Sequence, residues 1–436
     1  MNVIDVWSGR RAASLQKAMR LSNEAFAAHL GIATRTVANW HDKPCMEPMP
    51  VNQEALDTAL SRASDEVQER FRLVMQSAEA ESVPTAEVEP RLAPPVVGSM
   101  FLAIARESST EAFLRATEIG SDAIQYLQEQ AGRVARDYDV LTPVSTFGNA
   151  REVRDFALRL AEITRRPRDL VDLYVVVGQA TALMGSIAFD LGHWDATAYL
   201  IRSAKTYADL AGHASLTAWT FGLHATLAFW CGKADTALDH VAAGLVAAPV
   251  GAPRSRLLHI GARAHAVRND RAGVVAALQA AEVDRDLSRD LTDELHDDIG
   301  GEFRFDDARG AACAGAAWLK LGEGAQAERH VRRTLDAYAA DSADLLHLSL
   351  LTGARIDMAA AHLLQNDLDG ACAFLDPVFA LDAGHRTATL VGRLIEIRVL
   401  LNAPRWSRDS ATEPVRMAAR AWIDDAPVRW PALSTS

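Results

Sequence analysis

The chain has 436 residues, of which 49% are hydrophobic but only 6% are aromatic, and its formal net charge is −12 at pH 7. This length fits two or three domains rather than one core, and the composition favours packed helices over a β-rich fold. Its four scattered cysteines and the absence of about 20 consecutive uncharged apolar residues argue against a disulfide framework, a zinc site and a membrane span. Because the first residues also lack the apolar run of a signal peptide, we expect a cytoplasmic protein.

Positive charge is concentrated near the beginning of this acidic chain. Between Arg10 and Lys43 there are six Arg or Lys residues against the two acids Glu24 and Asp42, a local charge of +4. Each phosphate contact needs a cation or an amide donor, so a basic segment of this kind suits nucleic acid. A solvated helical face is the alternative.

Two short helices are predicted inside the basic segment, after a first helix over 14–20 (SLQKAMR). Ser22 is a good N-cap for a helix over 23–30, and its inward-facing residues at helical spacing are Phe26, Ala27 and Leu30. Gly31 permits the left-handed turn that ends this helix.

The next helix, 34–40 (TRTVANW), is expected to bury Val37 and Trp40 and to expose Arg35, Ala38 and Asn39. Two helices of about eight residues joined at a glycine form a helix-turn-helix. The second helix of such a pair can enter the major groove of DNA.

The string LSNEAFAAHLGIATRTVANW resembles the Cro and lambda-repressor type of helix-turn-helix, also called the XRE family. Its F-A-x-x-L-G-I-x-x-R-T-V-x-x-W form, followed by NQEALDTALSRAS and a later ERF, resembles the head of actinobacterial regulators that carry a tetratricopeptide-like body. The resemblance covers roughly 60 to 75 residues. It implies a sequence-specific transcription regulator that binds a double-stranded DNA operator.

By position, the resemblance implies three side chains that point at base edges and three that approach phosphates; these are Thr34, Arg35 and Asn39, and Asn23, Thr36 and Lys43, respectively. Arg pairs with guanine and Asn with adenine in the major groove, and hydroxyls or amides at a helix start hold phosphate. The family has Ser or Thr at the cap of this helix where this chain has Ala33, so Thr34 either caps the helix or contacts a base. The alternative for each is an ordinary exposed helix residue.

We predict three segments. Residues 1–76 form the helix-turn-helix head, completed by the amphipathic helices NQEALDTALSRA and SDEVQERFRLVMQSA. Residues 77–95 contain four Pro and four Glu and cannot bury enough apolar area to order themselves, so they are a linker. Residues 96–436 form a helical body.

The body repeats a short pattern in which a Gly or Asn turn separates two amphipathic helices. The turn residues are Gly192, Gly232, Asn269, Gly322 and Asn366, at intervals of 40, 37, 53 and 44 residues. These intervals are longer and less regular than the roughly 34 residues of a tetratricopeptide repeat. The body therefore resembles that family with degenerate units, a solenoid of helical hairpins in an all-α protein; an irregular helical domain is the alternative.

The resemblance to tetratricopeptide repeats implies a concave surface lined by the first helix of each pair, which commonly holds a peptide. The positions carried over to it are Gln179, Ser186, Trp219, Thr226, Arg256, His259, Arg263 and Arg309. Arg256, His259 and Arg263 lie at i, i+3 and i+7, so they share a helix face and could clamp a carboxylate or phosphate. The alternatives are a solvated face or ion pairs with the acidic segment 282–298 and, for Trp219, a place in the core.

The acidic segment lacks the spacing of a calcium loop, so we expect solvated helix ends there rather than a metal site. No P-loop, nucleophile elbow or dinucleotide fingerprint is present, and we expect neither catalysis nor a cofactor. The sequence thus predicts a homodimeric regulator whose body supplies dimer contacts and senses a peptide or small molecule. The alternative is a helical-repeat adaptor that binds proteins, with DNA binding secondary or lost.

Overall fold

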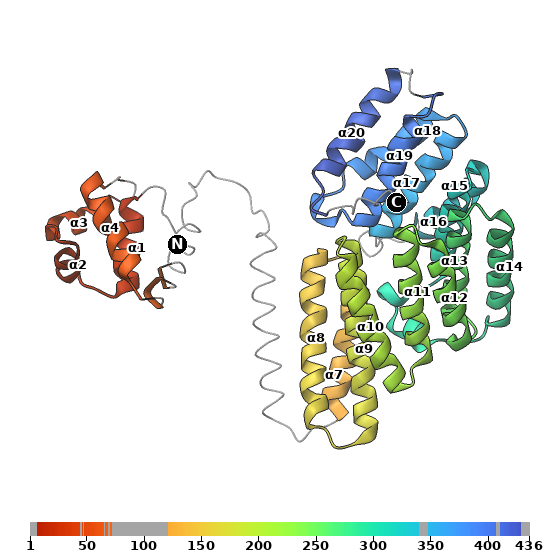
Figure 1. The fold of residues 1–436 in the computed structure, drawn as a ribbon, viewed down its shortest axis with the longest axis horizontal. Helices are drawn as coiled ribbons and strands as arrows, with labels where there is room; N and C mark the ends of the chain where they lie inside the picture. Colours follow the sequence, from red (N-terminus) through yellow and green to blue (C-terminus); the bar gives the residue numbers. More distant parts are fainter. Residues whose placement is uncertain are drawn as a thin grey trace. The chain divides into compact units, whose positions relative to one another are not determined.

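The structure is a computed structural model that describes residues 7–43, 46, 48–64, 66–68, 70–71, 121–339, 348–406 and 410–428. Within these residues every regular element is helical, which confirms the predicted all-α class (Figure 1). The chain divides into two compact units, Met1–Leu102 and Ala103–Ser436, and each is described by itself. The predicted linker over 77–95 lies outside the described residues.

The described residues of the amino-terminal unit include the helices α1 (Gly9–Met19), α2 (Asn23–Leu30), α3 (Thr34–Asp42) and α4 (Pro50–Arg62), and residues 66–68 and 70–71 are helical as well. They enclose a small core whose fully buried large side chains are Trp7, Leu15, Phe26, Val37, Trp40 and Leu56. The same positions produce the helical spacing of apolar residues in the sequence, because a helix buries one stripe of its surface.

The connection from α2 to α3 has the predicted geometry. The side chain of Ser22 accepts a hydrogen bond from the backbone N–H of Ala25 at 3.2 Å and so caps α2. Gly31 ends this helix with φ 70° and ψ 30°, a left-handed conformation that costs glycine little. Ala27, which is 2% exposed, packs in the core that the two helices share.

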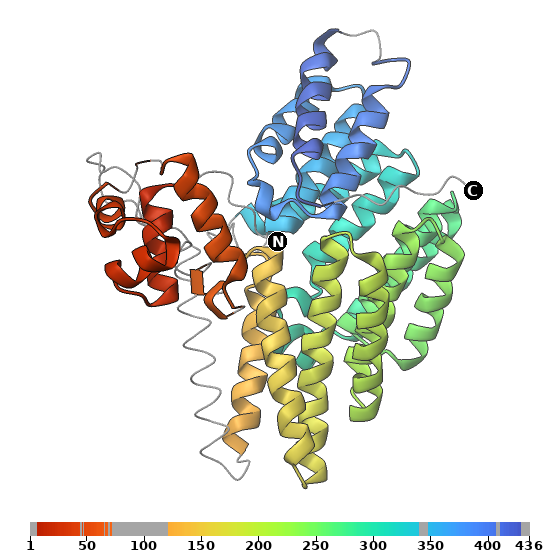
Figure 2. The ribbon, with the colours of Figure 1, turned by 60° about the vertical axis from the view of Figure 1, so that its left-hand side comes forward.

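The carboxy-terminal unit is a series of helical hairpins (Figures 1 and 2). Its longer helices are α7 (Ser121–Arg136), α8 (Pro143–Ile163), α9 (Pro167–Asp190), α10 (Trp194–Ala211), α11 (Ala214–Trp230), α12 (Ala234–Ala247), α13 (Ala252–Val267), α14 (Arg271–Leu287), α15 (Asp307–Lys320), α16 (Gly324–Ala339), α17 (Leu348–Leu364), α18 (Leu368–Phe379), α19 (Ala388–Leu401) and α20 (Glu413–Asp424). Proline stands at the start of several of them, where the missing N–H would lack a partner in any case.

The five predicted hairpin turns join α9 to α10, α11 to α12, α13 to α14, α15 to α16 and α17 to α18. Their turn residues all adopt the left-handed conformation, with φ of 79° at Gly192, 74° at Gly232, 57° at Asn269, 75° at Gly322 and 64° at Asn366. Glycine and asparagine tolerate this conformation better than other residues. The recurring Gly and Asn residues in the sequence therefore lie at hairpin turns in the structure.

The long interval between the third and fourth turns is explained by an insert between α14 and α15. It contains a short π-helix, η1 (Glu294–Ile299), and a 3₁₀ turn, η2 (Gly301–Phe303). Leu295 and Phe303 are fully buried in the core of α7 to α11, and Ser186 of α9 donates a hydrogen bond to Glu302 at 2.7 Å.

The acidic segment 282–298 is therefore not only a set of solvated helix ends, as its composition suggested. The carboxylate of Asp284 is only 7% exposed, accepts a hydrogen bond from the backbone N–H of Gly251 at 3.1 Å and lies 3.7 Å from Arg254. His296 is 1% exposed and bonds to Asp293 at 2.7 Å. Burial of the end of α14 and of the insert against the other hairpins supplies contacts that a charge count does not reveal.

The first helices of the hairpins form the inside of the unit. In order, α9, α11, α13, α15, α17 and α19 each contact the next, and α19 also contacts α9. The inner helices therefore close around a centre. Helix α9 is long and apolar enough to cross a membrane by composition, but 72% of its most apolar window is buried within the unit.

Candidate functional site

The six residues expected to contact DNA lie on or beside α2 and α3. Helix α3 buries Val37 and Trp40, each 1% exposed, and this orientation leaves Thr34, Arg35 and Asn39 exposed. Lys43, directly after the helix, is also exposed, whereas Asn23 and Thr36 are half-buried. In the described part of the chain, neither Arg35 nor Lys43 has a carboxylate oxygen within 4.0 Å.

The structure resolves the two roles considered for Thr34. The N-cap of α3 is Ala33, and no side chain caps this end of the helix. Thr34 is the first helical residue, and its hydroxyl is not used as a cap. The alternative that Thr34 caps the helix is therefore wrong, because the residue is already inside the helix. Its exposed side chain stays a predicted base contact.

Gln16 of α1, which sequence reasoning missed, ties the three helices together. Its Nε2 donates to the backbone oxygen of Leu21 at 3.1 Å and to Oδ1 of Asn23 at 2.8 Å. Its Oε1 lies 2.7 Å from Nε2 of His41 on α3. Gln16 is 6% exposed, so its polar atoms need partners, and the contacts fix the positions of Asn23 and α3.

The carboxy-terminal unit contains a cavity of about 250 Å³ at the centre of the inner helices. All six inner helices contribute to its lining, as do residues after α7 and the insert. Five of the residues predicted on the concave surface are in this lining; they are Ser186, Thr226, Arg256, Arg263 and Arg309. This cavity is the site that the closed arrangement of the hairpins creates.

The other three predicted concave residues do not line the central cavity. Gln179 and Trp219 are each 1% exposed and pack in the core. His259 lines a second cavity of about 140 Å³, whose lining includes α14 and α16. The clamp considered for Arg256, His259 and Arg263 therefore does not form. His259 faces α14 and α16, whereas the two arginines face the central cavity.

Arg256 of α13 is held in the cavity wall by Trp219. Its Nη1 donates to the backbone oxygen of Trp219 at 2.9 Å, and its guanidinium lies 4.8 Å from the centre of the Trp219 ring. Burial lowers the pKa of Arg256 to about 10, so the group stays charged at neutral pH. The pair with the acidic segment considered from sequence is absent among the described residues: Arg254 pairs with Asp284 instead.

Arg263 lies two turns further along α13, also against aromatic rings. Its guanidinium is 4.4 Å from the centre of the Phe229 ring and 5.8 Å from that of Trp230. Burial lowers its pKa, while the nearby Cys313 and Asp357 act in the opposite direction. Stacking on aromatic faces stabilises a guanidinium but does not neutralise its charge.

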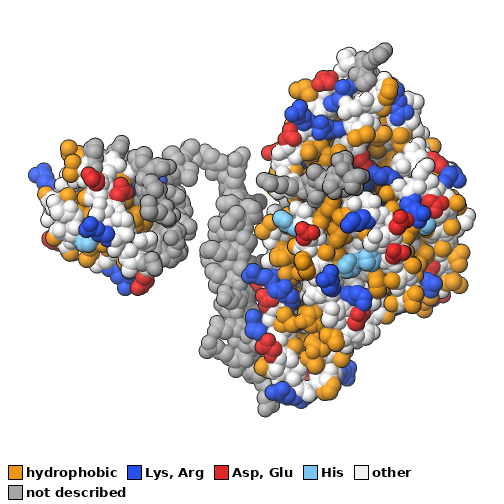
Figure 3. All heavy atoms as spheres, viewed as in Figure 1, with side chains coloured by type: hydrophobic (Ala, Val, Ile, Leu, Met, Phe, Trp, Pro, Cys, Tyr) orange, Lys and Arg blue, Asp and Glu red, His pale blue; other side chains and the backbone are white. Residues whose placement is uncertain are grey.

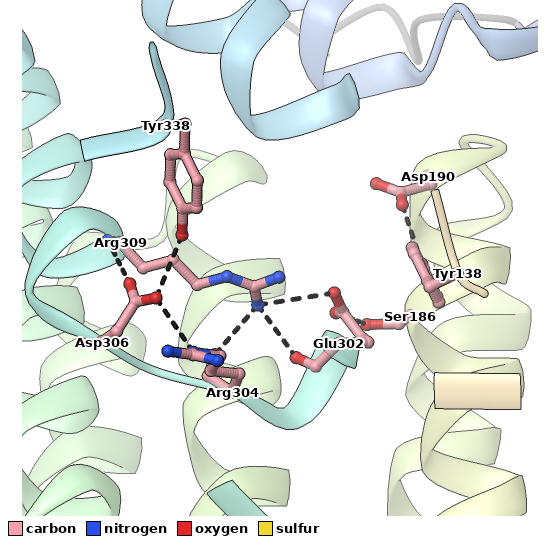
Figure 4. Close-up of polar contacts among 8 residues, drawn as sticks. All are labelled: Tyr138, Ser186, Asp190, Glu302, Arg304, Asp306, Arg309 and Tyr338. Carbon is pink, nitrogen blue, oxygen red and sulfur yellow. Dashed lines mark hydrogen bonds and ion pairs between the residues drawn. The ribbon is translucent and has the colours of Figure 1, made fainter. Parts of the chain in front are cut away.

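Arg309 is used to hold the insert in place (Figure 4). Its Nη1 donates to the backbone oxygens of Glu302 at 3.1 Å and Arg304 at 2.9 Å. The same side chain lies 3.9 Å from the Glu302 carboxylate. Burial works against its charge, but the carboxylates of Glu302, Asp139 and Asp306 outweigh this effect and raise its pKa.

Sequence reasoning missed the acidic residues of the cavity. Asp190 is the last residue of α9 and accepts a hydrogen bond from the hydroxyl of Tyr138 at 2.8 Å (Figure 4). Burial raises the pKa of Asp190 well above its usual range, and the nearby Glu302 adds to the effect. Burial likewise raises the pKa of Asp139 to about 6, although Arg309 partly counteracts it.

Asp357 of α17 and Arg393 of α19 form an ion pair on another part of the wall. Their side chains are 7% and 19% exposed. Asp190 and Asp357 carry a sequence signal that can be recognised afterwards: each is a lone acid in or at the carboxyl end of an otherwise apolar helical stretch. A negative charge at the carboxyl end of a helix, as at Asp190, is disfavoured by the helix dipole, so an acid at that position can indicate a functional role.

The outer surface of this unit does not offer a comparable site on the side that Figure 3 shows. Basic and acidic side chains are interspersed there, without a large area of one sign. Among the described residues no group of three or more His, Cys, Asp or Glu side chains could hold a metal ion.

No family model matches the sequence, and a search of curated proteins gave no match either.

Proposed function

We propose that this protein is a sequence-specific DNA-binding transcription regulator, which reads an operator with α3 and responds to a ligand in its helical-repeat unit. The observation that carries the proposal is the orientation of α3. Its apolar face, Val37 and Trp40, is buried, while Arg35 and Asn39 project from the exposed face without an acidic partner in the described residues. An exposed helix with these two side chains can place them at guanine and adenine edges in a major groove.

The resemblance of LSNEAFAAHLGIATRTVANW to the XRE helix-turn-helix supports the same proposal. Lys43 and the half-buried Asn23 and Thr36 suit phosphate contacts beside α3. A protein with two-fold symmetry can contact both half-sites of a symmetric operator at once, so we propose that two chains bind one operator. The helical-repeat unit would supply the contacts between them and, in the cell, change DNA affinity through its ligand.

The test is selection of duplexes from a random pool by the full chain, followed by measured affinities for the selected and a scrambled duplex. We expect one sequence to be enriched. Arg35→Ala should reduce the preference for that sequence by about 1 to 3 kcal/mol while leaving weak, salt-sensitive binding to the scrambled duplex intact.

Arg62→Ala is the matched control, since it removes one exposed arginine from the same unit but from α4. It should retain the preference. If Arg35→Ala discriminates as well as the parent chain, α3 does not read bases. If no duplex is enriched at all, the protein functions as the adaptor that binds other proteins through its hairpins.

A further inference from the structure

The central cavity of the helical-repeat unit has an acidic end. Asp139, Asp190 and Glu302 all line it. The negative charge of Glu302 acts on both aspartates, and that of Asp139 also acts on Asp190. Among the described residues, no Lys or Arg nitrogen lies within 4.0 Å of the Asp139 or Asp190 carboxylate. Arg309 lies 3.9 Å from the Glu302 carboxylate, and its charge also acts on Asp139, from beyond ion-pair distance.

The same cavity has a basic end. Arg263 and Arg393 both line it and repel each other, while Asp357 pairs with Arg393. Within the described residues, Arg263 has no carboxylate oxygen within 4.0 Å. Its neighbours in the wall are aromatic rings and Cys313, and the Asp357 carboxylate, which pairs with Arg393, acts on it only from beyond ion-pair distance.

The two ends are separated along α13. Arg256, Ile260 and Arg263 of this helix all face the cavity, and Arg256 feels the charges of Glu302 and Arg309 from the acidic end. Arg263 lies seven residues further on, about 10 Å at the rise of an α-helix. The carboxylate that acts on both Arg263 and Arg393 is Asp357.

Uncompensated charge in a partly buried cavity is costly unless a ligand supplies the counter-charge. An ammonium group would favour the ionised forms of Asp139 and Asp190, and a carboxylate or phosphate would accept hydrogen bonds from the guanidinium of Arg263. A cavity of about 250 Å³ is near the lower limit of ligand sites, which suits a small metabolite rather than an extended peptide.

We propose that the central cavity binds a small dipolar molecule, with an ammonium group beside Asp139 and Asp190 and an anionic group beside Arg263. This names the chemical class of the effector and rests on the proposed function only for its regulatory consequence. The binding itself is a property of the helical-repeat unit.

The test uses calorimetry on the full chain without DNA and three matched probes: 6-aminohexanoate, hexanoate and hexylamine. The first carries both charges, and the others carry one each on the same carbon chain. We expect 6-aminohexanoate to bind at least about tenfold more tightly than either single-charge probe, because only it satisfies both ends. Equal affinity for 6-aminohexanoate and one of the other probes, or no binding of any probe up to millimolar concentration, would overturn the proposal.

Variants of Asp190 and Arg263 test which end of the cavity binds each charged group of the probe. Asp190→Asn keeps an oxygen that can accept the Tyr138 hydroxyl and should reduce the affinity for 6-aminohexanoate to that for hexanoate. Arg263→Gln should reduce it to that for hexylamine, and Arg263→Lys should restore part of it. The controls are Arg268→Gln, whose arginine pairs with Asp235, and Asp336→Asn in α16; both should bind the probe as the parent does.

The outcome is separable from that of the proposed function. A chain that selects a duplex but binds none of the probes disproves the dipolar site and leaves DNA recognition standing. A chain that binds 6-aminohexanoate through Asp190 and Arg263 but enriches no duplex has the site without the regulator. Loss of binding in Arg268→Gln as well as in Arg263→Gln would show a general effect on folding and contradict the assignment.

Discussion

A carboxyl group in the wall of the central cavity, Asp139, illustrates how burial affects a single residue. Its ordinary pKa of 3.8 is raised to about 6, first by burial and then by Glu302. The folded chain therefore holds a proton at pH values where the unfolded chain has lost it. Between about pH 4 and pH 6 stability decreases as pH rises, and above pH 6 the folded state carries a poorly compensated carboxylate.

We expect Asp139→Asn to be more stable than the parent chain at pH 7.5, by roughly 1 to 2 kcal/mol. The gain should disappear near pH 4, where the parent residue is protonated in the folded state. Urea unfolding of both chains at the two pH values measures the difference. A gain of the same size at pH 4 and pH 7.5 would show that ionisation is not its cause.

Arg35 and Lys43 have different expected roles although both are exposed cations of the amino-terminal unit. Lys43→Ala should weaken binding to selected and scrambled duplexes alike, because a phosphate contact carries no sequence information. The slope of log affinity against log salt concentration should become smaller by about 1. A salt titration of DNA binding checks this, and a change of preference between the two duplexes would instead place Lys43 at a base.

Small residues between the two helices of a hairpin determine how closely those helices pack. A Cβ atom on Gly315 of α15 would lie 2.5 Å from Cγ2 of Val331 on α16, closer than side chains tolerate. Gly148 of α8 has no atom within 4 Å of the corresponding position. The first glycine therefore permits two helices of a hairpin to approach closely, and the second serves no such purpose.

We expect Gly315→Ala to destabilise the helical-repeat unit by about 1 to 3 kcal/mol, since the pair must separate or Val331 must move. Gly148→Ala is the matched control and should stabilise it by up to about 1 kcal/mol, because alanine favours a helix interior. Thermal unfolding of the full chain gives both values. Similar changes in the two variants would mean that helix propensity, not packing, dominates at Gly315.

At the scale of the whole molecule, the proposal requires two heads acting on one operator. A duplex with two half-sites gains affinity only when both are occupied by the same assembly. We expect sedimentation equilibrium of the full chain with its selected duplex to show two chains per duplex. Shortening the duplex to one half-site should reduce affinity strongly, whereas a stoichiometry of one chain per complete duplex would contradict the two-fold arrangement.

Local patterns predicted much of the fold. The N-cap Ser22, the left-handed Gly31 and the five hairpin turns depend on interactions within a few residues, and all are found as predicted. The orientation of α3 also follows from local spacing, because burial of Val37 and Trp40 fixes which side chains remain outside. The roles of Arg35 and Asn39 at base edges stay predictions.

The site in the helical-repeat unit was predicted less completely. Arg256 and Arg263 were placed on its inner surface from the resemblance to tetratricopeptide repeats, but Gln179 and His259 were not placed correctly. Trp219 lies in the core, which was the alternative considered for it. Their positions depend on the rotation of each helix against neighbours that are distant in sequence. The acidic residues were missed because Asp139, Asp190 and Glu302 are separated by up to 163 residues and meet only in the folded chain.

The sequence by itself determined the helices, their caps and turns and the exposed face of α3, since hydrogen bonds and apolar periodicity over a few residues govern these features. Only the tertiary structure decided that the hairpins close, with α19 against α9, and that the insert carrying Glu302 enters the space between them. The physical reason is that closure and cavity electrostatics arise from packing between remote segments, for which no local pattern exists.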